Sequence, residues 1–399
     1  MDIFKIAKQL HNKTLPPLGQ VPEPLLDLAV NLSRFRGRFQ ALSSIERAVA
    51  AIRHKETDRV PVATIVCAGG RQLSGISFPD YARHADKAAQ VFLDALEFAG
   101  GDVIVLLLDL SVEASDLGQK LEYPHNSTPR PDYANPVIRD LDDYDHIQPI
   151  TLTNAPRMSE YIRLCQNVVK KVGFRSLVSG FIYGPLGVLA MMRGAENMFK
   201  DCVLHPNKVK RACESITEVL VEYADAQCKT GVSAVTIDTL FASKNGVSKR
   251  LWEEIEGPFS REISRKIKEH GLLTGIHNCG HDLYFDAQIK FMEPDLISFA
   301  HLPDDCATPK EMKDRYGKYI TLVGYVPTPL LVHGTAKEVM EECWRQIDDL
   351  APGGGFILAP GCEYPPNIPL TNAIAMVNAS KRYAKSRGTA RASRTWRTT

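Results

Sequence analysis

The fold is decided by three consecutive stretches, SAVTIDT (233–239), LWEEIEGPFSREISRKIKEHG (251–271) and LLTGIHN (272–278). The outer two are short and largely apolar, which is typical of parallel strands that are covered on both faces. The middle stretch repeats apolar residues at the spacing of a helix. Two parallel strands joined by a helix form a βαβ unit. The sequence therefore predicts an α/β protein built on a parallel sheet.

The same alternation extends outward from this unit in both directions. Six further strand-like runs are VPVATIV (60–66), DVIVLLLD (102–109), SLVSGFIYG (176–184), LISFAHL (296–302), YITLVGYV (319–326) and GFILAP (355–360). Eight strands with helices between them predict an α/β fold of the (β/α)8 or TIM-barrel type. The alternative is a doubly wound open sheet, which usually has fewer strands and a glycine fingerprint between a strand and a helix. The glycine cluster PGGGF (352–356) precedes a strand and lacks that context.

The barrel pattern occupies residues 44–386, which we expect to form one domain. Residues 1–43 are an N-terminal helical extension, in which LLDLAVNLSRF (25–35) has the pattern of an amphipathic helix. The stretch 110–175 is long for one connection, and its prolines suit a surface excursion that carries a helix. Residues 387–399 end a segment rich in Lys and Arg, and we expect a flexible, solvated tail there.

Composition excludes several classes of protein. The net charge is +1, and hydrophobic residues make up 44% of the chain, so no global field attracts nucleic acid. No apolar run reaches the roughly 18 residues of a membrane span. The first residues lack the layout of a secretory signal, which predicts a cytoplasmic protein. Its nine cysteines are then free thiols or metal ligands.

Candidate metal ligands follow two of the predicted strands, in GIHNCGH (275–281) and APGCE (359–363). The carboxyl ends of barrel strands meet at one mouth, and residues i and i+2 of an extended segment project to the same side. One imidazole and two thiolates suit zinc, and three protein ligands leave a fourth position open, as in catalytic sites. Either motif alone is weak evidence, but together they predict a zinc site of His277, Cys279 and Cys362.

Other polar residues lie at strand ends or beside the proposed ligands. Asp238 and Glu363 are candidate catalytic carboxylates that would move a proton. Loop capping or pairing with an arginine is the alternative for each, and Glu363 is also a candidate fourth ligand. Candidate substrate-binding residues are Tyr183, Tyr325, Asp109 and His281, with core packing, capping or support of the ligands as their alternatives. Of the remaining cysteines we expect most in the core, whereas Cys67 and Cys306 follow strands and are candidates to line the site.

Three segments resemble the uroporphyrinogen decarboxylase superfamily. They are ERAVAAIRHKETDRVPV (46–62), GFIYGPLGVLAMMRGAENMFKDCVLHP (180–206) and LVGYVPTPLLVHGTAKEV (322–339). The resemblance runs from about residue 44 to 386. The superfamily fold is a TIM barrel, so the resemblance implies the same fold as the strand pattern.

Two branches of that superfamily differ in their motifs. The decarboxylases carry an arginine-rich signature that binds substrate carboxylates, and here the matching segment IVCAGGRQLSG (65–75) keeps only Arg71, a candidate substrate-binding residue. The branch that serves corrinoid-dependent methyl transfer carries H-x-C and a late cysteine as zinc ligands. The chain has the same pattern at His277, Cys279 and Cys362, so the resemblance implies a zinc-dependent methyltransferase.

The resemblance also implies partners. No corrinoid-binding segment is visible, so we expect a corrinoid-carrying protein to supply a cobalamin-type cofactor. The favoured reaction moves a methyl group from a small donor, such as a methoxylated aromatic, to the Co(I) corrinoid, which would be an O-demethylation. The alternative is transfer from the methyl-corrinoid to a thiol of the coenzyme M type. A porphyrinogen decarboxylase and a non-catalytic scaffold with structural zinc remain further alternatives, and a homodimer is one candidate assembly.

Overall fold

Seven parallel strands form one curled sheet in which each strand pairs with its neighbours along the chain. The structure, a computed structural model, describes residues 16–37 and 40–395. The strands are β1 (Val103–Val105), β4 (Leu177–Tyr183), β5 (Ala234–Asp238), β6 (Leu273–Asn278), β7 (Leu296–Phe299), β8 (Thr321–Val326) and β9 (Phe356–Pro360). Every residue of β4, β6 and β9 is buried. The prediction of parallel strands covered on both faces is therefore confirmed.

The first predicted strand, 60–66, does not form a regular strand. One isolated parallel bridge joins Val62 to Leu358 of β9, and the Val62 carbonyl accepts the amide of Asp102, just before β1, at 2.7 Å. Pro61 has no amide proton to donate, and Ile65 has a φ of 45°, which ends the extended backbone. The sheet is thus a curled, seven-stranded parallel sheet, and the eighth strand of the predicted barrel is reduced to this bridge.

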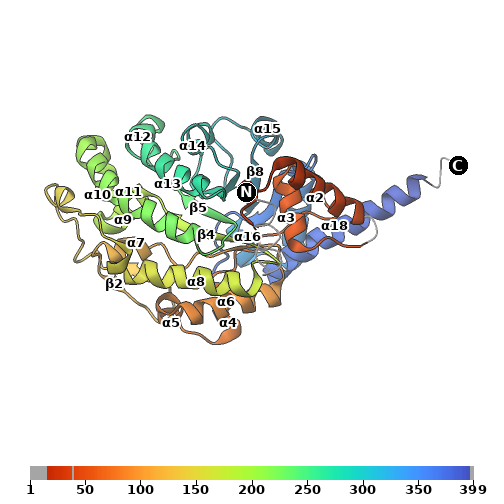
Figure 1. The fold of residues 1–399 in the computed structure, drawn as a ribbon, viewed down its shortest axis with the longest axis horizontal. Coiled ribbons are helices and arrows are strands. Elements are labelled where there is room, and N and C mark those ends of the chain that lie inside the picture. The colour runs from red at the N-terminus through yellow and green to blue at the C-terminus, as the bar shows by residue number, and fades with distance from the viewer. Residues whose placement is uncertain (1–15, 38–39, 396–399) are drawn as a thin grey trace.

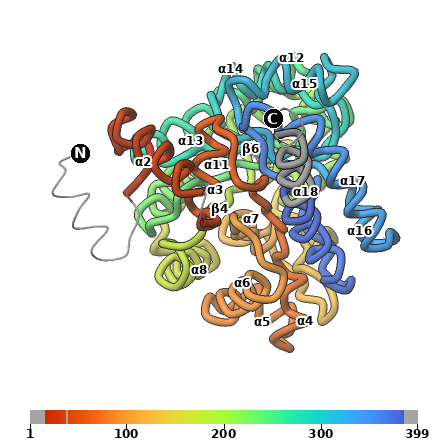
Figure 2. The backbone as a smooth tube through the Cα atoms, turned by 90° about the vertical axis from the view of Figure 1, so that its right-hand side faces the viewer, coloured from red at the N-terminus to blue at the C-terminus, as the bar shows by residue number. Residues whose placement is uncertain are grey.

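Helices cover the outside of the sheet (Figure 1). They are α3 (Ser44–Ile52), α4 (Arg71–Ser74), α5 (Phe78–Arg83), α6 (Ala85–Ala99), α7 (Val112–Asp116), α8 (Pro156–Val172), α9 (Pro185–Arg193), α10 (Ala195–Leu204), α11 (Pro206–Cys228), α12 (Lys249–Ile255), α13 (Gly257–Glu269), α14 (Phe285–Met292), α15 (Pro309–Arg315), α16 (Thr328–His333), α17 (Ala336–Leu350) and α18 (Thr371–Thr395). Figure 2 shows α6, α8, α14, α17 and α18 arranged around β4 and β6.

Local sequence sets where several of these helices begin. Ser43 and Thr335 each accept the amide three residues later, and the glutamates there, Glu46 and Glu338, bond back to the cap. This reciprocal capping box satisfies two amides that a helix start leaves free. Proline occupies the first position of α8, α9 and α11, where its missing amide proton has no cost.

The N-terminal extension packs against the rest of the α/β fold at the end opposite α10 and α12 (Figure 1). The predicted helix 25–35 is present as α2 (Glu23–Arg36), and Val30 of α2 packs on Val49 and Ala50 of α3. Just before α2, the amide of Gly19 donates to the carbonyl of Gly271, which precedes β6, at 2.9 Å. Residues 1–15 and 38–39 of the extension lie outside the described residues.

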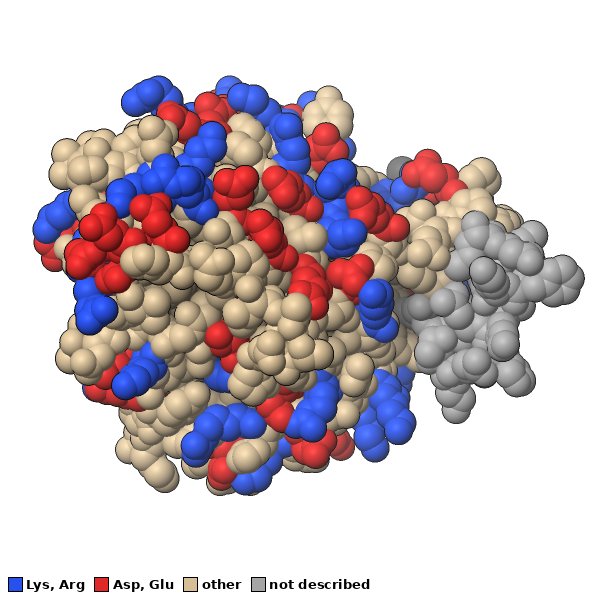
Figure 3. Space-filling view, turned by 60° about the vertical axis from the view of Figure 1, so that its left-hand side comes forward, with Lys and Arg blue, Asp and Glu red and all other residues tan. Residues whose placement is uncertain are grey.

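The long excursion 110–175 contains a small hairpin, β2 (Leu121–Glu122) with β3 (Arg130–Pro131), and the predicted helix, which is α8. At the other end of the chain, α18 runs to Thr395, and the last four residues of the basic tail lie outside the described part. None of the helices described combines the length and the apolar composition that crossing a bilayer requires. Figure 3 shows acidic and basic side chains interspersed over one face, as the balanced composition predicts.

Candidate metal centre

One imidazole and two thiols meet where β6 and β9 end. The ligand atoms of His277, Cys279 and Cys362 all lie within 4.8 Å of one another. Among the residues that the structure describes, no other three His, Cys, Asp or Glu side chains gather in this way. The imidazole is only 9% exposed. The structure thus brings together the three side chains that the sequence predicts as zinc ligands.

Asn278 holds the segment between the first two ligands. Its side chain is fully buried and donates to the carbonyls of Thr239 and Ala242 at 3.1 and 3.0 Å. Its own side-chain oxygen accepts the amide of Gly280 at 3.0 Å. Because side chains alternate along an extended segment, anchoring Asn278 on one side presents His277 and Cys279 on the other.

Two glycines allow the loops around the ligands to approach closely. A Cβ atom at Gly280 would lie 2.4 Å from the Ser243 hydroxyl, and one at Gly361 would lie 2.9 Å from the Cα atom of Ala300. Both distances are too short for any larger residue. The glycines that flank Cys279 and Cys362 in the sequence are therefore required by the close approach of neighbouring loops.

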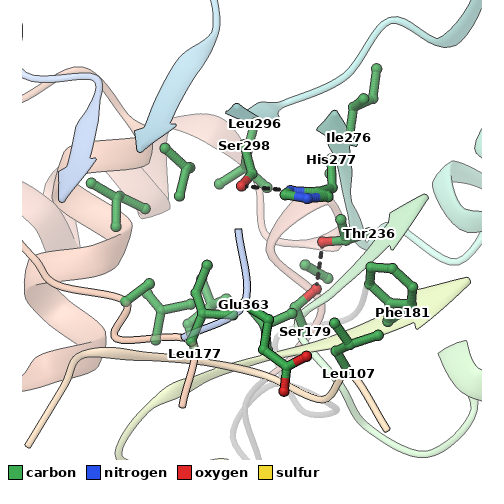
Figure 4. A pocket seen from close by; sticks show the side chains of 18 residues that line it. Leu107, Leu177, Ser179, Phe181, Thr236, Ile276, His277, Leu296, Ser298 and Glu363 are labelled. Atoms are coloured by element: carbon green, nitrogen blue, oxygen red, sulfur yellow. Dashed lines mark hydrogen bonds between the residues drawn. The ribbon is translucent and has the colours of Figure 1, made fainter. Parts of the chain in front are cut away.

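The strand register aligns a row of side chains across four strands. Tyr183 pairs with Asp238, Asp238 with His277, and His277 with Ser298. The Ser298 hydroxyl lies 3.0 Å from Nδ1 of His277 (Figure 4). A partner at one ring nitrogen fixes the orientation of a histidine ligand. Nε2 is then the nitrogen that remains for a metal ion.

Asp238 is buried beside the three ligands. It is 4% exposed, and its Oδ1 atom has no hydrogen-bond partner. Burial raises its pKa to about 7, although the nearby imidazole of His277 opposes this. An unpartnered buried carboxylate oxygen is costly unless a positive charge lies close by. The position therefore suits a residue beside a cation or one that exchanges a proton near neutral pH.

Glu363 points into the interior of the curled sheet (Figure 4). Its Oε1 atom accepts the amide of Ala68 at 3.1 Å. Burial raises its pKa to about 8, and the thiol of Cys362 adds to this shift. Its carboxylate is not among the atoms that gather within 4.8 Å. The geometry therefore places it next to the ligand group and not within it.

The two thiols influence each other strongly. A hydrogen bond from Cys279 and the adjacent imidazole of His277 lower the pKa of Cys362. The same contact raises the pKa of Cys279. The pair therefore favours a thiolate at Cys362 beside a protonated Cys279, and a bound dication would displace the remaining proton.

The other predicted site residues divide into two groups. Tyr183 lies near the ligands: it is buried, its amide donates to Glu113 at 3.0 Å, and its hydroxyl pKa is raised by burial and by Asp238. Tyr325 lies elsewhere, because its ring stacks on Phe299 at 5.2 Å and its hydroxyl accepts from Arg345 of α17. The tyrosine of β8 therefore faces the surrounding helices.

Three further candidates have partners of their own. Asp109 forms a buried ion pair with Arg157 at 2.6 Å. The Arg71 guanidinium lies 3.4 Å from the centre of the Phe78 ring. His281 stacks on the ring of His301 at 3.7 Å. None of these three side chains joins the ligand group.

The candidate cysteines outside the ligand group also differ. The Cys67 thiol lies 3.6 Å from the Val105 carbonyl. Burial raises its pKa and the nearby Glu363 adds to this shift, so Cys67 lies near the site. Cys306 contacts Asp305 and not the ligands.

The sequence did not reveal Asn278 and Ser298, because their roles follow from loop contacts and strand register. It also missed Glu256, which is buried near Asp238 and has a pKa raised by burial to about 8.

The uroporphyrinogen decarboxylase (URO-D) family matches residues 43–383, and the chain therefore belongs to this family. It is similar to the methylcobamide:CoM methyltransferase MtaA of Methanosarcina barkeri (strain Fusaro / DSM 804), with 23% identity over 341 residues, covering 84% of this chain and 97% of the relative. It is also similar to the uroporphyrinogen decarboxylase of Helicobacter pylori (strain P12), with 22% identity over 349 residues. This match covers 82% of this chain and 97% of the relative.

A solved structure shares the fold. A methyltransferase from Methanosarcina mazei superposes with a TM-score of 0.73 at 21% sequence identity, covering 86% of this chain and 99% of that one. The relatives thus include both methyltransferases and decarboxylases.

Proposed function

We propose that the chain is a zinc-dependent methyltransferase that moves a methyl group between a small molecule and the corrinoid of a separate partner protein. The observation that carries this proposal is the set of one imidazole and two thiols at the ends of β6 and β9. Arg71, the one arginine of segment 65–75, is stacked on Phe78, so that segment offers no cluster of free arginines for the carboxylates of a porphyrinogen.

The residues present fit zinc. Nitrogen and thiolate donors are its usual ligands, and three protein ligands leave a position for substrate. The unpartnered Oδ1 of Asp238 is the kind of buried negative charge that a nearby dication compensates. When bound, zinc would act as a Lewis acid that lowers the pKa of a thiol or polarises an ether oxygen.

The chain's own residues orient the site and handle protons. Ser298 fixes the imidazole of His277, and Asn278 fixes the backbone between the first two ligands. In the thiol direction, the acceptor sulfur would take the methyl group from the partner's methyl-Co(III), which would leave as Co(I), and the thiol would release its proton. We expect Asp238, with a pKa of about 7, to accept that proton.

Both directions of transfer use the same site. The relatives named as methylcobamide:CoM methyltransferases support a thiol acceptor. The extension before residue 43, where the family match begins, supports a different substrate such as a methoxylated aromatic donor.

We also propose that segment 61–63 closes the sheet into a (β/α)8 barrel, with residues 44–386 as one domain. Val62 supports this proposal because it has main-chain partners on both sides.

The test follows the corrinoid spectrum. Zinc-loaded protein is mixed with a Co(I) corrinoid protein and a panel of methoxyarenes, methylamines and methanol, and the reverse reaction starts from methyl-Co(III) and thiols. We expect conversion between Co(I) and methyl-Co(III) with at least one compound, loss of this conversion in Cys362→Ala, and retention in Cys306→Ala. Conversion by neither donors nor thiols, with zinc bound, would overturn the proposal.

A further inference from the structure

A cavity lies inside the curled sheet, with His277 of the candidate metal centre on its wall (Figure 4). We call it the interior chamber. Its volume is about 60 Å³, and residues from all seven strands line it, including Leu177, Ala234 and Leu296 from the starts of β4, β5 and β7. His277 and Glu363 also line it. Barrel interiors of this kind are normally filled by bulky branched side chains, so empty space here requires an explanation.

Two alanines border the chamber. Ala63 and Ala234 lie on its wall, and the side chain of each ends at the Cβ atom, so that neither fills the space beyond it. Gly275 also lies on the wall, but a Cβ atom there would lie 2.6 Å from the Thr236 hydroxyl, so this glycine allows the close approach of β5 and β6 and adds no space. The chamber is therefore bordered by small side chains from two different segments.

The hydroxyls and the imidazole on the wall are satisfied by one another, and Glu363 accepts the amide of Ala68 from outside the wall at 3.1 Å. The hydroxyls of Ser179 and Thr236 bond at 2.9 Å, and the hydroxyl of Ser298 bonds to the imidazole of His277 at 3.0 Å. No Lys or Arg is among the residues that line the chamber. A buried anion without a cationic partner is strongly disfavoured. The chamber therefore suits an uncharged, apolar group.

Size limits that group further. An engineered apolar cavity of about 150 Å³ holds a benzene ring, whereas this chamber measures about 60 Å³. An aromatic ring exceeds the space, but a chain of two or three carbons fits. The chamber also begins at His277 and extends away from the strand ends, so a chain within it would be attached to an atom bound at the metal.

We propose that the interior chamber holds the alkyl chain of a short, uncharged thiol, or of the methyl thioether formed from it, while the sulfur takes the open position at the metal. This rests on the proposed function and names its substrate class. The transfer is R–SH plus methyl-Co(III) giving R–S–CH3, Co(I) and a proton, or its reverse. A sulfonate-bearing thiol such as coenzyme M and a methoxylated benzene ring are both disfavoured inside the chamber.

Binding of thiols to the Co²⁺-substituted protein tests this without turnover, through the sulfur-to-cobalt charge-transfer absorption. The probes are ethanethiol, thiophenol and coenzyme M, with their dissociation constants compared in one buffer. We expect ethanethiol to bind at least about 10-fold more tightly than either of the others. Equal or tighter binding of thiophenol or coenzyme M would overturn the proposal.

Two chamber variants sharpen the test. Ala234→Leu fills the space and should weaken ethanethiol binding about 10-fold or more, whereas Ala29→Leu, the same change on the exposed face of α2, should not. Leu177→Ala enlarges the space and should reduce the difference between the dissociation constants of thiophenol and ethanethiol. This variant keeps the test valid if Ala234→Leu fails to fold. If the folded variants keep the same preference for ethanethiol over the other thiols, the chamber does not hold the alkyl chain.

The two proposals fail in different ways. Absence of any cobalt–thiolate absorption before a thiol is added would show that the three ligands hold no metal, and would overturn the proposed function. If cobalt binds but the protein does not distinguish thiols by their size and charge, only the assignment of the chamber is overturned.

Discussion

Two strand ends, around Asp109 after β1 and Asp238 in β5, look alike in sequence and differ in structure. Both aspartates follow apolar runs, and both are buried. Asp109 receives two hydrogen bonds from Arg157, at 2.6 and 3.3 Å, and one from the amide of Ser111. Asp238 has an oxygen with no partner and lies beside His277 and Cys362.

The difference comes from helix α8 and not from the strands. Arg157 lies at the start of α8, 48 residues after Asp109, and its guanidinium neutralises that carboxylate. Among the residues that the structure describes, the imidazole of His277 is the only cationic side chain that lowers the pKa of Asp238. An aspartate at a strand end of this sheet is therefore structural when a neighbouring helix supplies an arginine, and available for chemistry when none does.

The largest expected difference between Asp109 and Asp238 appears when the same substitution is made at both positions. In metal-free protein at pH 8, Asp109→Asn should reduce the free energy of unfolding by about 3 kcal/mol, because it leaves the buried Arg157 charge uncompensated. Asp238→Asn should leave stability unchanged or raise it, because it removes an unpaired buried charge. Urea unfolding measures both, and equal losses would contradict the distinction.

A second test uses Glu113, which lies four residues beyond Asp109. Burial raises its pKa from 4.5 to about 8, so the folded state holds this proton more tightly than the unfolded state. This group alone should lower the free energy of unfolding by about 1.4 kcal/mol for each pH unit as the pH rises from about 4.5 to about 8. Asp238, Glu256 and Glu363, whose pKa values are also raised, add to the same trend. Glu113→Gln should therefore make the slope shallower by one group's share, whereas the exposed control Glu254→Gln should not change it. An unchanged slope in Glu113→Gln would show that this carboxyl titrates normally.

The smallest expected effect concerns Ser298. Removing a partner of a metal-bound histidine usually lowers metal affinity about 10- to 100-fold. Ser298→Ala should therefore weaken zinc binding by that factor, measured by competition with a chelator. The control Ser264→Ala removes a buried hydroxyl in α13, far from the ligands, and should leave zinc affinity unchanged. If both variants bind zinc like the original protein, Ser298 does not position the imidazole.

The sequence was sufficient for most of the elements and for the clustering of His277, Cys279 and Cys362. Apolar runs of strand length identified β4 to β9, and the glycines beside Cys279 and Cys362 marked turns at strand ends. The prediction of a regular first strand was wrong, because its pairing depends on Pro61 and on the backbone at Ile65. The apolar pattern of 60–66 does not reveal either of these.

Side-chain partners from other elements were beyond the reach of the sequence. The pairing of Asp109 with Arg157 and of Tyr325 with Arg345 depends on how helices dock on the sheet. The contact between His277 and Ser298 depends on strand register. None of these leaves a signal in local composition, and each decides whether a residue belongs to the site.

Zinc content per chain tests the central claim most directly. After dialysis against zinc and removal of the excess, we predict one zinc per chain in the original protein and in Cys306→Ser. We predict none in Cys279→Ser or Cys362→Ser, with circular dichroism showing that both variants remain folded. Full zinc content in folded Cys279→Ser and Cys362→Ser would contradict the assignment of the metal to these ligands.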